Sequence, residues 1–163
     1  MFIYKIFSIP RRCFILLWKI RMRKHFHISV HLNGIPKIKH IKGGLLVGEH
    51  CTINGNCWLS CRGGISIGNN VSISRGCSFI ASGLDPDKFF KGEKTHIGKK
   101  IIVGNNVWIA TNSTILGGVT IADNIIVAAG SVVTKDLLDS YAVYAGVPAK
   151  KVKQYSKDDM INK

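Results

Sequence analysis

The chain has 163 residues, and its 46% of hydrophobic side chains is enough for the core of one domain. Lysine and arginine number 23 against 9 acidic residues, so the formal net charge is +14 at pH 7. This charge favours an anionic partner such as a membrane surface, a nucleic acid or a phosphorylated substrate. The five cysteines are an odd number in a chain that is not small and loop-rich, which argues against a framework of disulfide bonds.

The N-terminal residues 1–28 predict one or two helical pieces that break at Pro10. They are rich in lysine and arginine, and the first acidic residue of the chain is Glu49. One apolar face could lie on an anionic membrane, or it could cap the end of the fold or pack against a neighbouring subunit. The apolar run 14–18 is too short for a signal peptide, and Arg11 and Arg12 interrupt the longer apolar stretch as a membrane span. We therefore expect a cytoplasmic protein, which the membrane alternative would place peripherally at the inner face of the membrane.

Aliphatic residues recur at every sixth position through most of the remaining chain. The series are Val47, Ile53, Leu59, then Ile67, Ile73, Phe79, and finally Val103, Ile109, Ile115, Ile121, Val127, Val133. Neither a helix nor a lone strand has a period of six. The pattern predicts a solenoid of short strands, with Gly, Asn and Asp at its corners.

Two cysteines, Cys51 and Cys57, follow the same six-residue spacing and would stack on neighbouring rungs. The chain has no close CxxC pair and no paired histidines, so small buried side chains are favoured over a zinc site and no metal is expected.

The repeat is interrupted by residues 82–99, a loop that contains Asp85, Asp87, Glu93 and His96. These titratable groups gather in a chain that is otherwise poor in carboxylates. Loops that break a regular scaffold often carry the function, so a functional role is favoured over a tolerated surface insertion.

Three segments resemble, in this order, the signature of hexapeptide-repeat acyltransferases: 102–110, 130–136 and 145–150. The resemblance is to the maltose/galactoside acetyltransferase-like branch, which includes O-acetyltransferases of surface-polysaccharide clusters. It implies a left-handed parallel β-helix, an exception to the usual right-handed crossover, together with a homotrimer and acetyl-CoA as donor.

The expected fold is therefore an all-β, left-handed parallel β-helix of hexapeptide repeats with a short helical N-terminal segment and an excursion loop at about 82–99. The expected divisions are a basic helical segment and approach over 1–44, the acyltransferase domain over 45–153 and a polar tail over 154–163.

The same resemblance implies residues that bind coenzyme A. The residues expected to line the pantetheine groove are Trp108, Ala110, Thr111 and Ala129. Thr134 and Lys135 match a Thr-Lys pair that contacts coenzyme A. Lys150 and Lys153 match basic residues that reach the nucleotide phosphate. Candidate residues for the acceptor are Ser74, Asp85 and Asp87. The alternatives are ordinary solvated charge for the lysines and a packed corner aromatic for Trp108.

The chain departs from the family at its catalytic histidine. The family carries this residue in the loop, where the present sequence reads Ala-Ser-Gly-Leu-Asp-Pro-Asp over 81–87. His96 is the leading substitute as general base, and Glu93 is close enough in sequence to orient it. His50 is the next candidate, and the four histidines of the basic leader are expected to be surface groups.

The favoured function is acetyl-CoA-dependent O-acetyl transfer to a sugar hydroxyl in surface-polysaccharide biosynthesis, by direct attack with a histidine base and no covalent enzyme intermediate. One alternative is a non-catalytic scaffold or binding protein, which the missing histidine favours and the intact coenzyme A motifs disfavour. Another is a sugar N-acyltransferase. Nucleic acid is not expected, because the excess charge lies outside the repeats and no nucleic-acid motif accompanies it.

Overall fold

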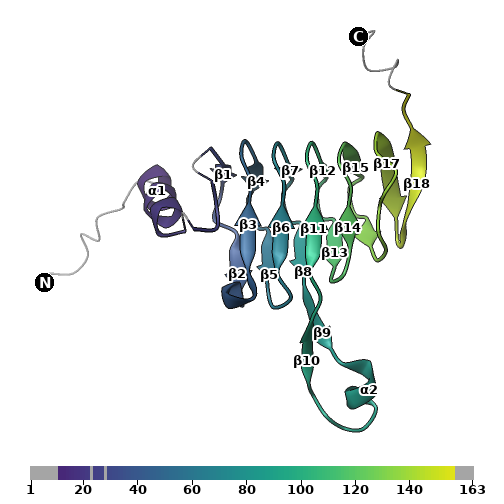
Figure 1. Cartoon of the computed structure of the whole chain (residues 1–163). Helices are drawn as coiled ribbons and strands as arrows, with labels where there is room; N and C mark the ends of the chain where they lie inside the picture. The colour runs from purple at the N-terminus through teal and green to yellow at the C-terminus, as the bar shows by residue number, and fades with distance from the viewer. Residues whose placement is uncertain (1–10, 23, 28, 157–163) are drawn as a thin grey trace, which may run out of the picture.

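The protein, represented by a computed structural model, is described over residues 11–22, 24–27 and 29–156. Short strands stack in successive coils and form three sheets along the stack (Figure 1). Sheet A contains β3 (Leu45–Val47), β6 (Ile65–Ile67), β11 (Ile101–Val103) and β14 (Thr120–Ile121). Sheet B contains β1 (His31–Asn33), β4 (Thr52–Asn54), β7 (Ser72–Ile73), β12 (Trp108–Ile109), β15 (Ile125–Val127), β17 (Ala142–Gly146) and β18 (Ala149–Gln154). Sheet C contains β2 (Lys37–Lys39), β5 (Trp58–Ser60), β8 (Ser78–Ile80), β13 (Thr114–Leu116) and β16 (Val132–Val133).

The strands of successive coils pair in parallel, so that equivalent six-residue repeats lie over one another. Ile109 pairs with Ile73 in the coil before and with Val127 in the coil after. All three side chains are buried, as are the other side chains of the predicted six-residue series. Together they form one continuous core along the axis. The parallel β-helix predicted from the period is confirmed, and it agrees with the left-handed form that the resemblance implies.

A ladder of asparagines shapes the corner between sheets A and B. Asn70, Asn106 and Asn124 have φ of 54°, 54° and 59°, a left-handed conformation that asparagine tolerates better than most residues. The Asn70 Nδ2 donates to Asn106 Oδ1 at 2.6 Å, and the Asn106 Nδ2 donates to Asn124 Oδ1 at 3.2 Å. The predicted turn chemistry therefore also links successive coils.

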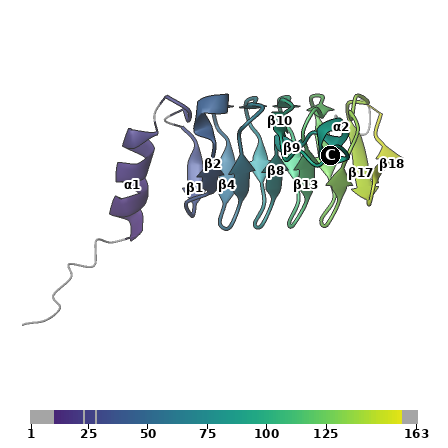
Figure 2. The same ribbon diagram turned by 90° about the horizontal axis from the view of Figure 1, so that it is seen from below.

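Both ends of the stack are covered. At the N-terminal end, helix α1 (Arg11–Arg21) packs Ile15 and Trp18 against the core, and the Trp18 ring lies 5.2 Å from that of Phe26. At the other end, β18 turns back antiparallel to β17 (Figures 1 and 2). The predicted capping helix is thus present in α1, while residues 1–10, with the break expected at Pro10, lie outside the described residues.

The first coil begins at Phe26, which forms a parallel bridge with Val47, inside the stretch 1–44 that the sequence analysis assigns to the N-terminal segment. Leu32 pairs with Ile53, and Ile38 pairs with Leu59. Phe26, Leu32 and Ile38 keep the six-residue spacing, but a 3-10 turn, η1 (Ile41–Gly43), lies between Ile38 and β3, the first strand of the second coil. This insertion breaks the period and conceals the first coil in the sequence.

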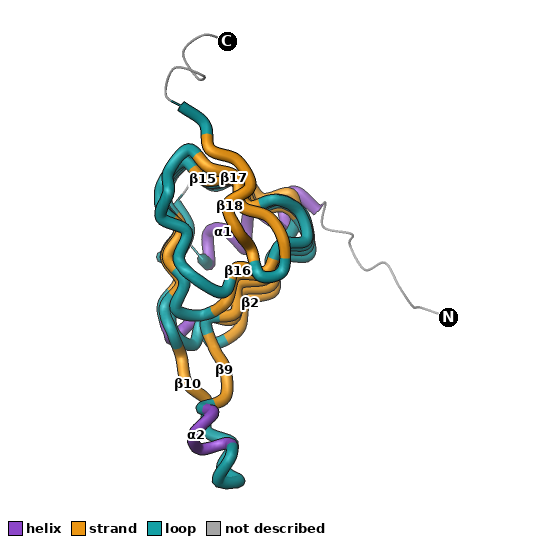
Figure 3. Tube along the Cα trace, turned by 90° about the vertical axis from the view of Figure 1, so that its right-hand side faces the viewer, coloured by secondary structure: helices purple, strands orange, loops and turns teal. Residues whose placement is uncertain are grey.

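The excursion expected at 82–99 is an arm built on an antiparallel hairpin, β9 (Ser82–Leu84) and β10 (His96–Gly98), with a short helix α2 (Pro86–Phe89) beyond it. Viewed along the stack, the coils superpose and the arm projects from one corner, between sheets C and A (Figure 3). Gly98 meets Gly63 so closely that a Cβ on Gly98 would lie 2.6 Å from the Gly63 Cα. Glycine at both positions therefore lets the arm rejoin the stack.

We expect Asn106→Ala to lower the free energy of unfolding by about 1–2 kcal/mol, because alanine disfavours the left-handed φ and breaks two ladder hydrogen bonds. Asn106→Gly is the control, since glycine keeps the conformation and loses only the side-chain bonds. Urea unfolding followed by circular dichroism measures both. Equal losses for alanine and glycine would show that the backbone conformation contributes nothing.

Candidate active site

The hairpin of the arm places His96 opposite the segment 81–87, where the resemblance led us to expect a histidine. In β9–β10 the Cα partner of His96 is Leu84, which lies in the segment 81–87 that lacks a histidine. Cross-strand partners project from the same face of a hairpin, so the imidazole stands beside the Leu84 side chain. One strand of this hairpin therefore has no histidine, and the strand that faces it carries His96.

The side chain of His96 is exposed, and within the described residues it makes no hydrogen bond or ion pair. Glu93, expected to orient it, is also exposed, and its backbone N–H donates to the Lys88 carbonyl at 2.9 Å. No hydrogen bond or ion pair joins Glu93 to His96 in the described part of the chain. The imidazole is thus free to meet an acceptor, but the structure shows no carboxylate that orients it.

The two aspartates of the arm have different surroundings. Asp85 caps helix α2: its Oδ1 accepts from the backbone N–H of Asp87 at 3.1 Å and from that of Lys88 at 3.4 Å. Asp87 is exposed in the first turn. Asp85 therefore fixes the start of helix α2, in the connection between β9 and β10.

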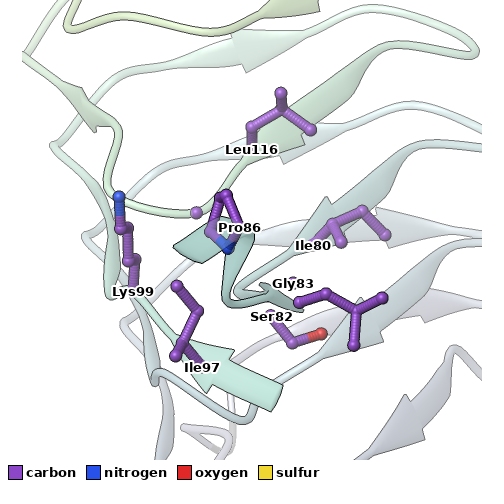
Figure 4. Close-up of a pocket in the computed structure, with 9 residues that line it drawn as sticks. Ile80, Ser82, Gly83, Pro86, Ile97, Lys99 and Leu116 are labelled. Carbon is purple, nitrogen blue, oxygen red and sulfur yellow. The ribbon is translucent and has the colours of Figure 1, made fainter. Parts of the chain in front are cut away.

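A cavity of about 230 Å³ lies at the base of the arm (Figure 4). Its lining is mostly apolar and comes from both hairpin strands and the adjacent coil: Ile80, Ser82, Gly83, Leu84, Pro86, Ile97, Lys99, Leu116 and Gly117. Because Leu84 lines it, the cavity adjoins the strand that faces His96. Among the residues that line this cavity, Lys99 alone has a charged side chain.

A second group of predicted residues lies along the corner between sheets B and C. The Trp108 side chain is 49% exposed, and its Nε1 donates to the Ser74 Oγ at 3.1 Å. Thr111, in the same coil as Trp108, and Ala129, in the next coil, are both exposed and stack, with the Gly130 N–H donating to the Thr111 carbonyl at 2.9 Å. The indole therefore borders a column of small side chains that leaves the backbone accessible, as a pantetheine arm requires.

Ala110 lies at the start of the same corner but is only 9% exposed. Its N–H donates to the Val127 carbonyl, and its own carbonyl accepts from the Ser113 hydroxyl at 2.8 Å. The structure thus places Ala110 in the wall of the coil, beneath the surface formed by Thr111 and Ala129.

The remaining predicted residues for coenzyme A are exposed cations and a threonine on other elements. Lys150 and Lys153 lie on β18, and neither has an acidic partner among the described residues, whereas their neighbour Lys151 pairs with Asp139 at 2.8 Å. Thr134 and Lys135 follow β16, at the corner from which the arm also projects. One chain therefore does not bring them beside Thr111 and Ala129.

His50, the second candidate for the base, lies at the third corner, between sheets A and B. It is exposed, with φ of 53°, and its Nε2 is 3.9 Å from the Glu49 carboxylate. Within a single chain it shares no corner with the arm or with Trp108. Over the described residues, no group of three or more His, Cys, Asp or Glu is placed to hold a metal ion.

The repeat and the fold have known relatives. A family model described as bacterial transferase hexapeptide (six repeats) matches residues 100–135. A maltose O-acetyltransferase from Clostridium difficile 630 is 26% identical, with a TM-score of 0.76 over 85% of this chain and 75% of that one. A hexapeptide-repeat containing acetyltransferase from Vibrio cholerae is 26% identical, with a TM-score of 0.79 over 93% and 84%. A galactoside acetyltransferase in complex with coenzyme A is 26% identical, with a TM-score of 0.76 over 90% and 74%.

The Vibrio cholerae enzyme has also been solved with acetyl-CoA. A polysialic acid-specific acetyltransferase is more distant, at 25% identity and a TM-score of 0.60 over 81% of this chain and 62% of that one. No curated protein matches the chain. The comparisons confirm the predicted resemblance to hexapeptide-repeat acyltransferases of the maltose and galactoside acetyltransferase-like branch. With it they confirm the enzyme class, acyltransferase, and they agree with acetyl-CoA as the donor.

Four cysteines point into the core of the coil rather than to its surface. Burial raises the pKa of the Cys61 thiol to about 11, and Cys51, Cys57 and Cys77 are also buried, whereas Cys13 is exposed. We expect a colorimetric thiol reagent at about pH 8 to modify Cys13 rapidly and the four buried thiols only on unfolding, because the reactive species is an accessible thiolate. Cys13→Ser should abolish the fast phase. A fast phase that survives in this variant would contradict the burial.

Proposed function

We propose that the protein transfers an acetyl group from acetyl-CoA to a hydroxyl of a sugar acceptor in surface-polysaccharide biosynthesis. The observation that carries the proposal is the pairing of His96 with Leu84 on the arm, which gives a chain without the family's histidine an imidazole at the facing position. The likeness to a polysialic acid-specific acetyltransferase supports a polysaccharide or its precursor as the acceptor.

In the proposed reaction, neutral His96 accepts the proton of the acceptor hydroxyl as its oxygen attacks the thioester carbonyl. Backbone N–H groups stabilise the negative charge that develops on the carbonyl oxygen. The intermediate then collapses: the bond from carbon to sulfur breaks, the coenzyme A sulfur leaves and takes up the proton from the imidazolium. An acetyl ester and free coenzyme A result, and the enzyme needs no covalent intermediate.

The donor site in this proposal runs along the corner between sheets B and C. The Trp108 indole, fixed by its bond to Ser74, forms one wall for the pantetheine arm, while Thr111 and Ala129 leave room beside the backbone. Lys150 and Lys153, unpaired with acidic groups among the described residues, supply charge for the phosphates.

A homotrimer completes the proposed site. The arm, Thr134 and Lys135 lie at one corner of the coil, and the Trp108 column lies at the next, so two corners from neighbouring copies could form one groove. Such a head-to-tail contact closes into a trimeric ring when successive copies are related by a rotation of one third of a turn. The arm also carries Phe89 and Phe90, which are 49% and 85% exposed, and a second copy would cover them.

We also propose that the enzyme acts in the cytoplasm at the inner face of the membrane, with residues 1–28 in peripheral contact with anionic lipid. A basic segment suits this location, because anionic lipids attract it electrostatically. Acyl transfer to a sugar amine is the alternative outcome, and a non-catalytic scaffold is the outcome if no transfer occurs.

We expect His96→Ala to reduce acetyl transfer by at least about 100-fold, the usual size of general-base catalysis. Release of free thiol from acetyl-CoA, with p-nitrophenyl β-D-galactoside and glucosamine as probe acceptors, measures the rate. Products cleaved by hydroxylamine are esters, and stable products are amides. His50→Ala is the matched control and should retain activity; loss in His50→Ala with retention in His96→Ala would move the base to His50.

We expect Lys150→Ala and Lys153→Ala to raise the KM for acetyl-CoA several-fold with little change in kcat, because each lysine contributes attraction to phosphate rather than to the reacting atoms. S-acetylpantetheine lacks the nucleotide phosphates, so its KM should not change. Lys91→Ala, on the arm, controls for a general loss of charge. An equal effect on both donors would place these lysines outside the phosphate site.

A further inference from the structure

Helix α1 has two apolar faces on opposite sides. Its inward face contains Ile15 and Trp18, which pack against the core at the end of the stack together with Met22, the residue directly after the helix. Its outward residues Leu16, Leu17 and Ile20 remain 58%, 57% and 57% exposed. With 3.6 residues per turn, the two sets project on opposite sides of the helix. Capping of the β-helix therefore uses one face and leaves the other uncovered.

The outward face lies where the chain carries positive charge without acidic residues. Helix α1 has no acidic residue in its first turn, and no aspartate or glutamate occurs in the sequence before Glu49, whereas lysines and arginines are frequent there. Two copies of this face brought together would bring like charges together. A surface of anionic lipid would attract the same segment and bury the three aliphatic side chains in its interfacial layer.

The geometry favours contact with a membrane surface over a span. Helix α1 has 11 residues, and in the described part of the chain no helix is long and apolar enough to cross a membrane. The helix lies at the N-terminal end of the stack, away from β18 and clear of the arm (Figures 1 and 2). A lipid surface at this end would leave the Trp108 corner and the arm accessible.

We infer that the outward face of α1, formed by Leu16, Leu17 and Ile20, is a docking surface for membranes that contain anionic lipid, while the inward face seals the β-helix. The inference gives a structural basis to the peripheral location proposed above, but it does not depend on acetyl transfer. In a cyclic trimer all three copies of α1 point the same way along the rotation axis, so three weak contacts act on one membrane.

The chain contains a probe for this face. Cys13 lies three, four and seven residues before Leu16, Leu17 and Ile20, on the same side of the helix, and it is exposed while the other described cysteines are buried. An environment-sensitive fluorophore attached to Cys13 of the full chain therefore reports burial of the outward face. Vesicles of phosphatidylcholine alone and of phosphatidylcholine with phosphatidylglycerol test the role of charge.

We expect the fluorophore to shift to shorter wavelength with the anionic vesicles only, and sedimentation with these vesicles to fall at least about ten-fold in Leu16→Ser/Leu17→Ser/Ile20→Ser. Val152→Ser is the matched control, because Val152 is 62% exposed on β18 at the opposite end of the stack, and its vesicle binding should not change. Circular dichroism confirms that each variant folds.

Three results would overturn the inference. Equal sedimentation of the triple variant would show that charge alone binds the lipid. An unshifted fluorophore in protein that sediments with vesicles would place the contact elsewhere, and this readout uses the unmutated helix, so it stands even if the triple variant misfolds. Self-association that the triple variant abolishes, without lipid binding, would assign the face to a second copy of the chain.

Discussion

Parallel register between coils is the constraint on which the rest of the structure depends. Each rung buries an aliphatic side chain on the axis and bonds its backbone to the rungs above and below, so a shift of one residue would turn the aliphatics outward. The pairing of Ile109 with both Ile73 and Val127 shows how strictly the register is kept on either side of the arm. Residues distant in sequence become neighbours for this reason: Ser74 and Trp108 are 34 residues apart and form a hydrogen bond.

Register also explains how the arm can carry chemistry without disturbing the scaffold. The chain leaves sheet C at Ile80 and re-enters sheet A at Ile101, where it pairs with Ile65 as an uninterrupted coil would. The close approach of Gly98 and Gly63 ties the returning strand to the coil before it. The arm therefore presents His96 from a rigid base while its own tip remains outside the core.

Much of the fold could be predicted because each rung buries one side chain at every sixth residue, and this spacing is visible in the sequence. The first coil could not, since the turn at 41–43 separates Ile38 from Val47 and interrupts the period. Within the candidate site, the sequence proposes His96 because the loop contains no other histidine, but its cross-strand partner depends on the hairpin register, which only the three-dimensional structure shows. Nearness in sequence suggested Glu93 as the partner, whereas the structure faces His96 with Leu84.

The closed base of the arm has a consequence for how such an enzyme can change over time. Because both ends of the arm are fixed in adjoining rungs, residues can be added, lost or replaced between β9 and β10 without moving the corner that carries Trp108. In the proposed function the arm contacts the acceptor and the Trp108 corner binds the donor, so the two tasks lie on separate parts of the chain. Substitutions in the arm would then change the acceptor and leave the donor site unchanged.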